Sequence, residues 1–384
     1  MQCSNIISVS TIHPRKPKVW DLHSDLSVGP SQIHTRRQSN FEDYDVKLPL
    51  PSHVNSITST SNPFVKHCHK LRQSSSYRHS HRSALVVGAT PIREIYRFQR
   101  SSQEKTVIID CLLLLEKAEV PEWIDDFSVR IVEVSSVVMK KLSGMQSTES
   151  IEAIALMRMP TSFSDIDSEE KEVNCKTWFP SLHRVLVLDG VQDPGNLGTL
   201  LRSAMAFGWN GAFLLPGCCD PFNEKALRAS RGASFQLPIV SGTWNHLESL
   251  KNEFQIKMLA GHPGTDEKLK PVSHLSQKLA DSFVDVPLSL VLGSEGSGLS
   301  EKSRRLCELV SIPMAGEFES LNVSVAGGIF LGHVYSEIRR VLDHHLLGVV
   351  IMLPVAWSIQ HDNLEPGSFH LGLPFQAPTK LDVF

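Results

Sequence analysis

The sequence has few cysteines, and none is placed as a metal site or a disulfide framework requires. The 384-residue chain contains seven, scattered along its length and never spaced as C-x-x-C. Structural zinc sites need closely spaced ligand pairs, and disulfide-rich domains need a dense, even set of cysteines. We therefore expect no metal, no disulfide framework and a reducing compartment.

Long apolar runs and a strong net charge are also lacking. The longest apolar stretch, LLGVVIMLPVAW, is interrupted by Pro354 and is shorter than the roughly 20 residues of a membrane helix. The formal net charge is -3, so the chain as a whole does not attract a polyanion. We expect no membrane association, and a nucleic-acid partner has to be held by a local basic patch.

Neither common phosphate-binding glycine motif is present. The stretch VLGSEGSGLS, residues 291–300, runs G-x-x-G-x-G rather than G-x-G-x-x-G, and no G-K-[ST] follows it. This disfavours a nucleotide-dependent oxidoreductase. With 41% hydrophobic and 21% charged residues, the composition is that of an ordinary globular protein, and the length suits two domains.

The order of apolar and polar segments predicts two α/β domains. Residues 1–56 are rich in Ser, Pro and His, and the first 20 contain basic residues without an acid. This composition favours an organelle transit segment, with a disordered tail as the alternative. The expected divisions are a small α/β domain over 57–160, a linker over 161–182, a second α/β domain over 183–342 and a tail of unknown role over 343–384.

Apolar runs and helix signals fill both domains. In the small domain Asn62 and Pro63 predict a helix start, and ALVVG, TVIID and VRIVEV predict strands separated by helical TPIREIY and VPEWIDDF. In the second domain five apolar runs alternate with amphipathic segments, which predicts a parallel sheet covered on both faces. The five runs cover 183–189, 212–216, 256–261, 288–293 and 309–314. A last helix is expected from Val323 to Leu342.

Chemistry-bearing residues follow three of these strands, where sites of open parallel sheets form. After the first, Asn196 is placed to cap a helix that Gly208 ends, and Gly198 and Arg202 share one helix face. An Arg one turn beyond a bare Gly can lie over a ligand close to the backbone. The alternative is a plain cap and a solvated charge.

The other two strand ends are also rich in polar residues. One combines glycines with an acid, and the other combines an acid with Ser and Asn. Glu295 stands among Gly293, Gly296 and Gly298, an unusual choice for a plain turn. In GEFESLNVSVAGG, residues 316–328, one cap would need a single polar side chain, whereas Ser320 and Asn322 supply both donors and acceptors. A simple turn and a simple cap remain the alternatives.

Together these stretches resemble the three ordered motifs of the SpoU or TrmH RNA 2'-O-ribose methyltransferases of the SPOUT class. The matching residues are N-L-G-x-x-x-R (196–202), G-S-E-G-x-G (293–298) and I-P-M-x-G-x-x-E-S-L-N-V-S-V-A (312–326). The resemblance covers 57–342, because the small domain is similar to the substrate-binding domain of many members. It implies a trefoil-knotted methyltransferase domain, a pocket for S-adenosylmethionine and a homodimer.

The resemblance also implies roles for individual residues. The cofactor would be held around Gly293, Ser294, Gly296, Ile312, Met314 and Leu321. The catalytic set would comprise Arg202, Asn196, Glu295, Ser320 and Asn322. Because a guanidinium stays protonated in proteins, positioning a phosphate or stabilising the forming alkoxide suits Arg202 better than acting as a base. A departure is the Val-Ala-Gly-Gly sequence where members usually carry Ala at one or both final positions.

Basic residues gather in the small domain, where residues 57–105 hold nine Lys and Arg against two Glu. Such a face suits phosphates, with a solvated helix surface as the alternative. We expect RNA contacts from Lys66, Lys70, Arg72 and Arg78. Lys225, Arg228 and Arg231 form a second basic group, which the resemblance implies lies near the active site.

The sequence thus predicts an S-adenosylmethionine-dependent RNA ribose methyltransferase. The appended small domain favours ribosomal RNA over transfer RNA by analogy. A transfer RNA enzyme and a non-catalytic RNA-binding ribosome-assembly factor are the alternatives. The N-terminal composition places the protein in an organelle, the chloroplast ahead of the mitochondrion.

Overall fold

The structure is a computed structural model, and it describes residues 50, 53–101, 108–124, 129–147, 151–166, 174–264, 271–316 and 319–335. These residues fall within one compact unit. The expected transit segment, the expected tail and the end of the last helix beyond residue 335 lie outside the described residues.

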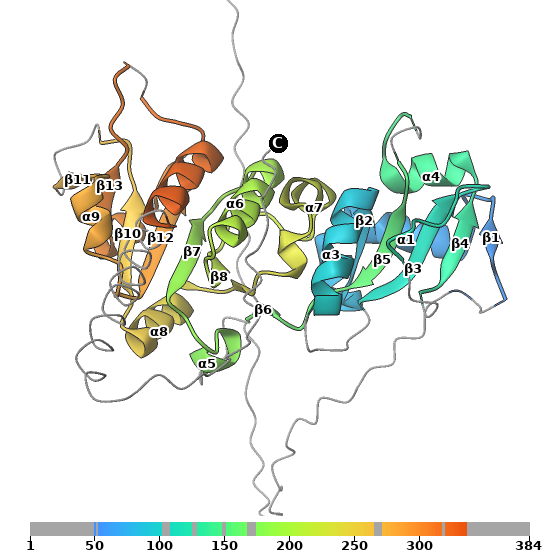
Figure 1. The fold of residues 1–384 in the computed structure, drawn as a ribbon, viewed down its shortest axis with the longest axis horizontal. Coiled ribbons are helices and arrows are strands. Elements are labelled where there is room, and N and C mark those ends of the chain that lie inside the picture. The colour runs from blue at the N-terminus through green and yellow to red at the C-terminus, as the bar shows by residue number, and fades with distance from the viewer. Residues whose placement is uncertain are drawn as a thin grey trace, which may run out of the picture. The chain divides into compact units, whose positions relative to one another are not determined.

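The small domain is a five-stranded sheet with helices (Figure 1), in the strand order β1-β4-β3-β5-β2. The strand β5 is antiparallel to both of its neighbours, and the other pairs are parallel. The strands are β1 (Ser56–Ile57), β2 (Ser83–Val87), β3 (Ile109–Leu115), β4 (Ile131–Val134) and β5 (Ile154–Arg158). The helices are α1 (Pro63–Gln73), α2 (Ser75–His81), α3 (Ala89–Ser101) and α4 (Ser136–Ser143).

Two details of this domain differ from the sequence prediction. The domain begins before residue 57, because Leu50 is buried in its core and the Arg130 guanidinium donates to the Leu50 and Val54 carbonyls. The described part of the helix expected over VPEWIDDF, residues 120–124, contains only a turn. The start of α1 is confirmed, because Asn62 Oδ1 accepts from the Phe64 amide at 2.9 Å.

The second domain is built on an eight-stranded sheet in which every pair is parallel, in the order β11-β13-β10-β12-β7-β8-β9-β6. The five predicted strands are present as β7 (Arg184–Asp189), β8 (Gly211–Leu214), β10 (Lys257–Gly261), β12 (Leu288–Gly293) and β13 (Glu308–Ser311). All residues of β7 are buried, as a strand covered on both faces requires.

Three further strands have no counterpart in the prediction: β6 (Phe163–Asp165), β9 (Ile239–Ser241) and β11 (Val272–His274). Each has three residues, too few to show a hydrophobic pattern. Because β6 is the edge strand of the large sheet, part of the linker expected over 161–182 belongs to the second domain.

The large sheet carries helices between its strands (Figure 1). They are α5 (Cys175–Trp178), α6 (Pro194–Ala206), α7 (Glu224–Ser230), α8 (Trp244–Phe254), α9 (Gln277–Asp281) and α10 (Glu301–Leu306). A last helix is described over 323–335. Because β13, β10, β12 and β7 are parallel neighbours, the loops after them open at one edge of the sheet.

Candidate active site

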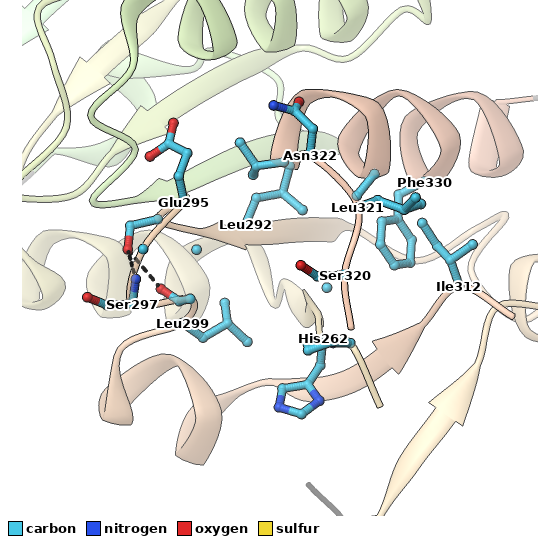
Figure 2. A pocket seen from close by; sticks show the side chains of 18 of the residues that line it. His262, Leu292, Glu295, Ser297, Leu299, Ile312, Ser320, Leu321, Asn322 and Phe330 are labelled. Atoms are coloured by element: carbon cyan, nitrogen blue, oxygen red, sulfur yellow. Dashed lines mark hydrogen bonds between the residues drawn. The ribbon is translucent and has the colours of Figure 1, made fainter. Parts of the chain in front are cut away.

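A pocket of about 580 Å³ lies at this edge (Figure 2). Its walls come from the loops after β10, β12 and β13 and from the first turns of the last helix. All six residues predicted to bind the cofactor line it: Gly293, Ser294, Gly296, Ile312, Met314 and Leu321. The second and third sequence motifs therefore form one cavity, of a size typical for small-molecule sites.

The glycine loop after β12 presents backbone to this pocket. The Ser294 amide donates to the Gly298 carbonyl at 2.9 Å, and the Gly298 amide donates back at 3.0 Å. A Cβ on Gly293 would lie 2.2 Å from the Gly298 carbonyl carbon, and Gly298 has a φ of +64°. Both positions therefore require glycine for a loop this tight.

The carboxylate of Glu295 connects this loop to the first motif. Its two oxygens accept hydrogen bonds from the Gln192 and Asp193 amides, both at 3.2 Å, and from the Asn196 side-chain amide at 3.1 Å. Burial raises the pKa of Glu295, but the hydrogen bonds from Asn196 and the backbone outweigh it, so that the pKa lies below its ordinary value. Glu295 is thus held as an anion.

Asn196 in turn connects the first motif to the third. Asn322 Nδ2 donates to Asn196 Oδ1 at 3.2 Å, while Asn322 Oδ1 accepts from the Ser324 amide at 2.9 Å and caps the last helix. Figure 2 shows Glu295 and Asn322 on the same side of the pocket. One chain of hydrogen bonds, Glu295–Asn196–Asn322, therefore joins all three motifs.

The prediction that Asn196 caps α6 is wrong. Asp193 caps the helix, because its Oδ1 accepts from the Asn196 amide at 2.8 Å. Asn196 lies within the first turn, and its side chain is left to bridge Glu295 and Asn322. The end of the helix is as predicted, since α6 stops at Ala206 and Gly208 has a φ of +67°.

Gly198 does not approach a ligand, contrary to the sequence interpretation. A Cβ there would lie 2.3 Å from the Ala226 carbonyl oxygen, so this glycine lets α6 pack closely against α7. Arg202, two turns beyond Asn196, is exposed. In the described part of the chain its guanidinium has no hydrogen bond or ion pair, and it is not among the residues that line the pocket. Ser320 lines the pocket.

The sequence interpretation missed part of the pocket wall. Gly261 ends β10, His262 and Pro263 follow it, and all three line the pocket. The strand itself was predicted, so the rule that sites form at carboxyl ends would have found them. Arg304 and Phe330 also line the pocket, but an Arg or a Phe on a helix gives no sequence signal that separates a site from an ordinary surface or core.

Most of the predicted RNA-contacting residues are exposed. Those with exposed side chains are Lys66, Lys70, Lys225, Arg228 and Arg231. The Lys70 ammonium lies over the Tyr77 ring, 4.2 Å from its centre. Arg72 is partly buried, and its Nε lies 3.3 Å from Glu224.

The prediction for Arg78 is wrong. Its side chain is 2% exposed, and its guanidinium donates to the Asp220 carboxylate and to the Leu71 and Arg72 carbonyls. Such a group has no free donor edge for a phosphate. Arg78 instead stabilises the contact between α2 and the loop after β8.

Two structural features are absent from the described residues. No group of three or more His, Cys, Asp and Glu side chains there is arranged to hold a metal ion. No helix in the same part of the chain has the length and apolarity to cross a membrane.

Solved structures share this fold. The AdoMet-bound rRNA methyltransferase of Sinorhizobium meliloti superimposes with a TM-score of 0.58 at 24% identity, over 74% of this chain and 98% of that one. An RNA 2'-O ribose methyltransferase structure gives a TM-score of 0.56 at 27% identity, over 73% of this chain and 98% of that one. The fold is that of the SPOUT class of methyltransferases.

Sequence relatives narrow the class to a family. The model of the SpoU rRNA Methylase family matches residues 183–332. A tRNA/rRNA methyltransferase of Synechocystis sp. is 31% identical over 284 residues, which are 74% of this chain and 94% of that protein. The 23S rRNA (guanosine(2553)-2'-O)-methyltransferase RlmP of Bacillus subtilis is 34% identical over 152 residues, 39% of this chain and 57% of that protein. The chain belongs to the SpoU/TrmH family of RNA methyltransferases.

Proposed function

We propose that this protein transfers a methyl group from S-adenosylmethionine to a ribose 2'-hydroxyl of RNA, and that the RNA is ribosomal. The observation that carries the proposal is the Glu295–Asn196–Asn322 chain beside a pocket built from the same motifs. Support for ribose and for ribosomal RNA comes from the relative RlmP, a 23S rRNA 2'-O-methyltransferase.

The pocket suits the proposed cofactor. Its glycine loop offers backbone groups at close approach, and apolar side chains such as Leu292, Leu321 and Phe330 provide walls for an adenine ring. AdoMet is bound in the related S. meliloti structure. When bound, the cofactor supplies an electrophilic methyl group that needs no further activation.

The protein's own residues have to position the hydroxyl group and ease the loss of its proton. Arg202 is exposed and free of protein partners in the described chain, so its guanidinium is available to an RNA phosphate or to the developing alkoxide. The hydrogen bonds that join Glu295, Asn196 and Asn322 fix the first turn of α6. Arg202 lies further along the same helix. Glu295 therefore acts as an anchor for the site.

A homodimer is part of the proposal. On the last helix Val325 and Ile329, one turn apart, are 51% and 41% exposed, and a Cβ on Gly328 between them would meet no atom within 4 Å. This apolar, closely approachable face supports the dimer that the family resemblance implies. Ile329→Glu should yield monomers in sedimentation equilibrium, and an unchanged dimer would exclude this face as the contact.

For localisation we propose an organelle, the chloroplast ahead of the mitochondrion, on the composition of residues 1–56. Fusing these residues to a fluorescent protein tests the proposal directly. Diffuse cytosolic fluorescence would contradict it.

The test of function is transfer of labelled methyl groups from S-adenosylmethionine to total RNA from cells lacking the protein, followed by mapping of the modified nucleotide. Wild type should label one ribosomal position, and Arg202→Ala should label none while it still binds the cofactor. Label in transfer RNA instead would mean that the substrate is transfer RNA and not ribosomal RNA. Cofactor binding without transfer to any RNA, including precursor particles, would favour the assembly-factor alternative.

A further inference from the structure

One cationic side chain of the pocket has no counter-charge among the described residues. Arg304 is the one Arg or Lys among the described residues that line the pocket. Its Nε is buried without a hydrogen-bond partner, and in the described chain its guanidinium forms no ion pair. Folded proteins retain few unsatisfied buried donors, and each one needs an explanation, of which a bound ligand is one.

The acid that lines the pocket does not pair with Arg304. Glu295 also lines the pocket, but its Oε2 accepts from the Gln192 amide and its Oε1 accepts from Asp193 and Asn196. Both oxygens are therefore engaged by the first motif. Among the described residues Arg304 therefore has no carboxylate partner, and its positive charge is available to a ligand.

The helix that carries Arg304 is firmly anchored. The buried carboxylate of Asp189, at the end of β7, accepts from the Ser300 amide at 2.9 Å and from the Ser303 hydroxyl. The Arg304 amide donates to the Ser300 carbonyl at 3.0 Å, so Arg304 lies one turn beyond this anchor. A guanidinium held on a fixed element loses little conformational freedom when it binds a ligand.

We propose that Arg304 binds the carboxylate of the cofactor's methionine moiety, an inference that rests on the proposed function. In S-adenosylmethionine the carboxylate is the one group with a full negative charge, whereas the ammonium and the sulfonium are both positive. A guanidinium pairs with a carboxylate through two parallel N–H donors. Arg304 therefore selects ligands that retain the amino-acid carboxylate.

The test is a binding cycle on the full-length protein by titration calorimetry. The ligands are S-adenosylhomocysteine and its decarboxylated analogue, and the variants are Arg304→Met, Arg304→Lys and the control Arg305→Met. Arg305 is on the same helix but lies outside the pocket and pairs with Glu301 at 3.0 Å. The control therefore removes the same charge from the same helix.

Arg304→Met should weaken binding of S-adenosylhomocysteine roughly 10- to 100-fold, the usual effect of losing a charged hydrogen bond. Affinity for the decarboxylated analogue should change by less than about 3-fold, and Arg304→Lys should be intermediate, since Lys keeps the charge but not the fork. Because Arg304→Met removes an unsatisfied donor, the unfolding midpoint of the ligand-free variant should equal or exceed that of wild type.

Three results would overturn the inference. Equal weakening of both ligands would assign Arg304 to the adenosine part, and unchanged affinity for both would remove it from the binding site. An Arg305→Met effect as large as that of Arg304→Met would show a general charge effect. A wild-type protein that binds neither ligand would be a different failure, since it would overturn the proposed function and this inference together.

Discussion

At the scale of single residues, the site depends on two asparagines that face each other. Asn196 donates to Glu295 and accepts from Asn322, a combination that a side-chain amide provides, because it has both a donor and an acceptor. Asp offers acceptors only. The Asn in the first motif is thus explained by the two neighbours it has to satisfy at once.

Asn196→Asp should lower kcat/KM for RNA methylation about 100-fold, because a carboxylate would then face Glu295 where an amide donor stood at 3.1 Å. Affinity for the cofactor should change by less than about 3-fold, since Asn196 does not line the pocket. Steady-state methylation and titration calorimetry measure the two effects.

Thr199→Ala, on an exposed position of the same helix, is the matched control and should behave as wild type. Adding Glu295→Gln to Asn196→Asp should recover part of the activity, because the new Gln amide can donate to Asp. Full activity in Asn196→Asp alone would contradict the role assigned to the hydrogen-bonded chain.

The sequence allowed a good prediction of which residues gather, but not of how they do so. The sequence predicts site roles for Glu295, Ser320 and Asn322, because a turn or cap needs fewer polar groups than these loops contain. Arg78 was mistaken for a surface residue, because its partner Asp220 is 142 positions away and no local pattern reveals it. Arg304 was missed because an Arg on a helix gives no sequence signal that separates a site from an ordinary surface.

At the scale of elements, close packing of helices explains two glycines, one of which, Gly198, had suggested a ligand. Gly198 admits the α7 backbone, while Gly327 on the last helix admits the Leu200 side chain, 2.2 Å from where its Cβ would be. Gly327 is therefore not available to the proposed partner subunit. Gly328, which faces open space, is available to it.

Gly198→Ala should lower the free energy of unfolding by about 1–3 kcal/mol or more, because the new methyl group meets a backbone carbonyl that cannot rotate away. Thr199→Ala is the control, because it also places Ala on α6 but at an exposed position. It should be neutral or stabilising by up to about 1 kcal/mol through helix propensity. Denaturant unfolding measures both, and equal effects would contradict the close packing of α6 on α7.

Element prediction succeeded where burial produces a long pattern. The runs that became β7, β10 and β12 are continuous and apolar because parallel strands are covered on both faces. The three-residue strands extend the sheet by backbone pairing, β11 at one edge and β9 with β6 at the other, which a side-chain pattern does not record. The described part of VPEWIDDF, with helical composition, forms a turn, since tertiary contacts override weak local propensity.

At the scale of the whole molecule, a buried ion pair connects the two sheets. Arg78 on α2 donates to Asp220 after β8, and Ser75 donates to the same carboxylate at 2.7 Å. His79 lies 3.1 Å from Asp165 on β6 and 3.6 Å from Asp220. One small-domain helix is thereby attached to two segments of the large domain.

Asp220→Asn should lower the free energy of unfolding by about 3–5 kcal/mol, because it leaves the Arg78 guanidinium buried without a counter-charge. The double variant Arg78→Met with Asp220→Leu should lose less, since it buries no unpaired charge. Denaturant unfolding checks both, and a double variant less stable than Asp220→Asn would contradict this explanation.

The same contact should respond to pH. The carboxylate of Asp220, 3.6 Å from the His79 ring, is the main cause that raises the pKa of His79 above its ordinary 6.5, against the opposing effect of burial. A raised folded-state pKa adds stability that is fully present below the unfolded-state pKa and is lost as pH rises through the folded-state value. The stability difference between wild type and His79→Gln should therefore be larger near pH 5.5 than near pH 8. A difference that does not vary with pH would exclude an ionised His79.

RNA binding should depend on the exposed lysines of α1. Lys66→Glu with Lys70→Glu should weaken binding and flatten the plot of log K against log salt by roughly 0.7–0.9 for each phosphate that the protein no longer neutralises. Lys251→Glu with Lys278→Glu, on α8 and α9, makes the same charge change and should leave the slope unaltered. Equal slopes in the two double variants would mean that the α1 lysines do not contact RNA and only form a solvated surface.

The most direct test of the central claim is to ask where on the nucleotide the methyl group goes. RNA labelled by the protein with tritiated S-adenosylmethionine is hydrolysed in alkali, which cleaves only where a free 2'-hydroxyl is present. Our account predicts that the label is recovered in alkali-resistant dinucleotides and is absent with Arg202→Ala. Label recovered in mononucleotides would mean that a base is methylated, and it would contradict the assignment of ribose as the acceptor.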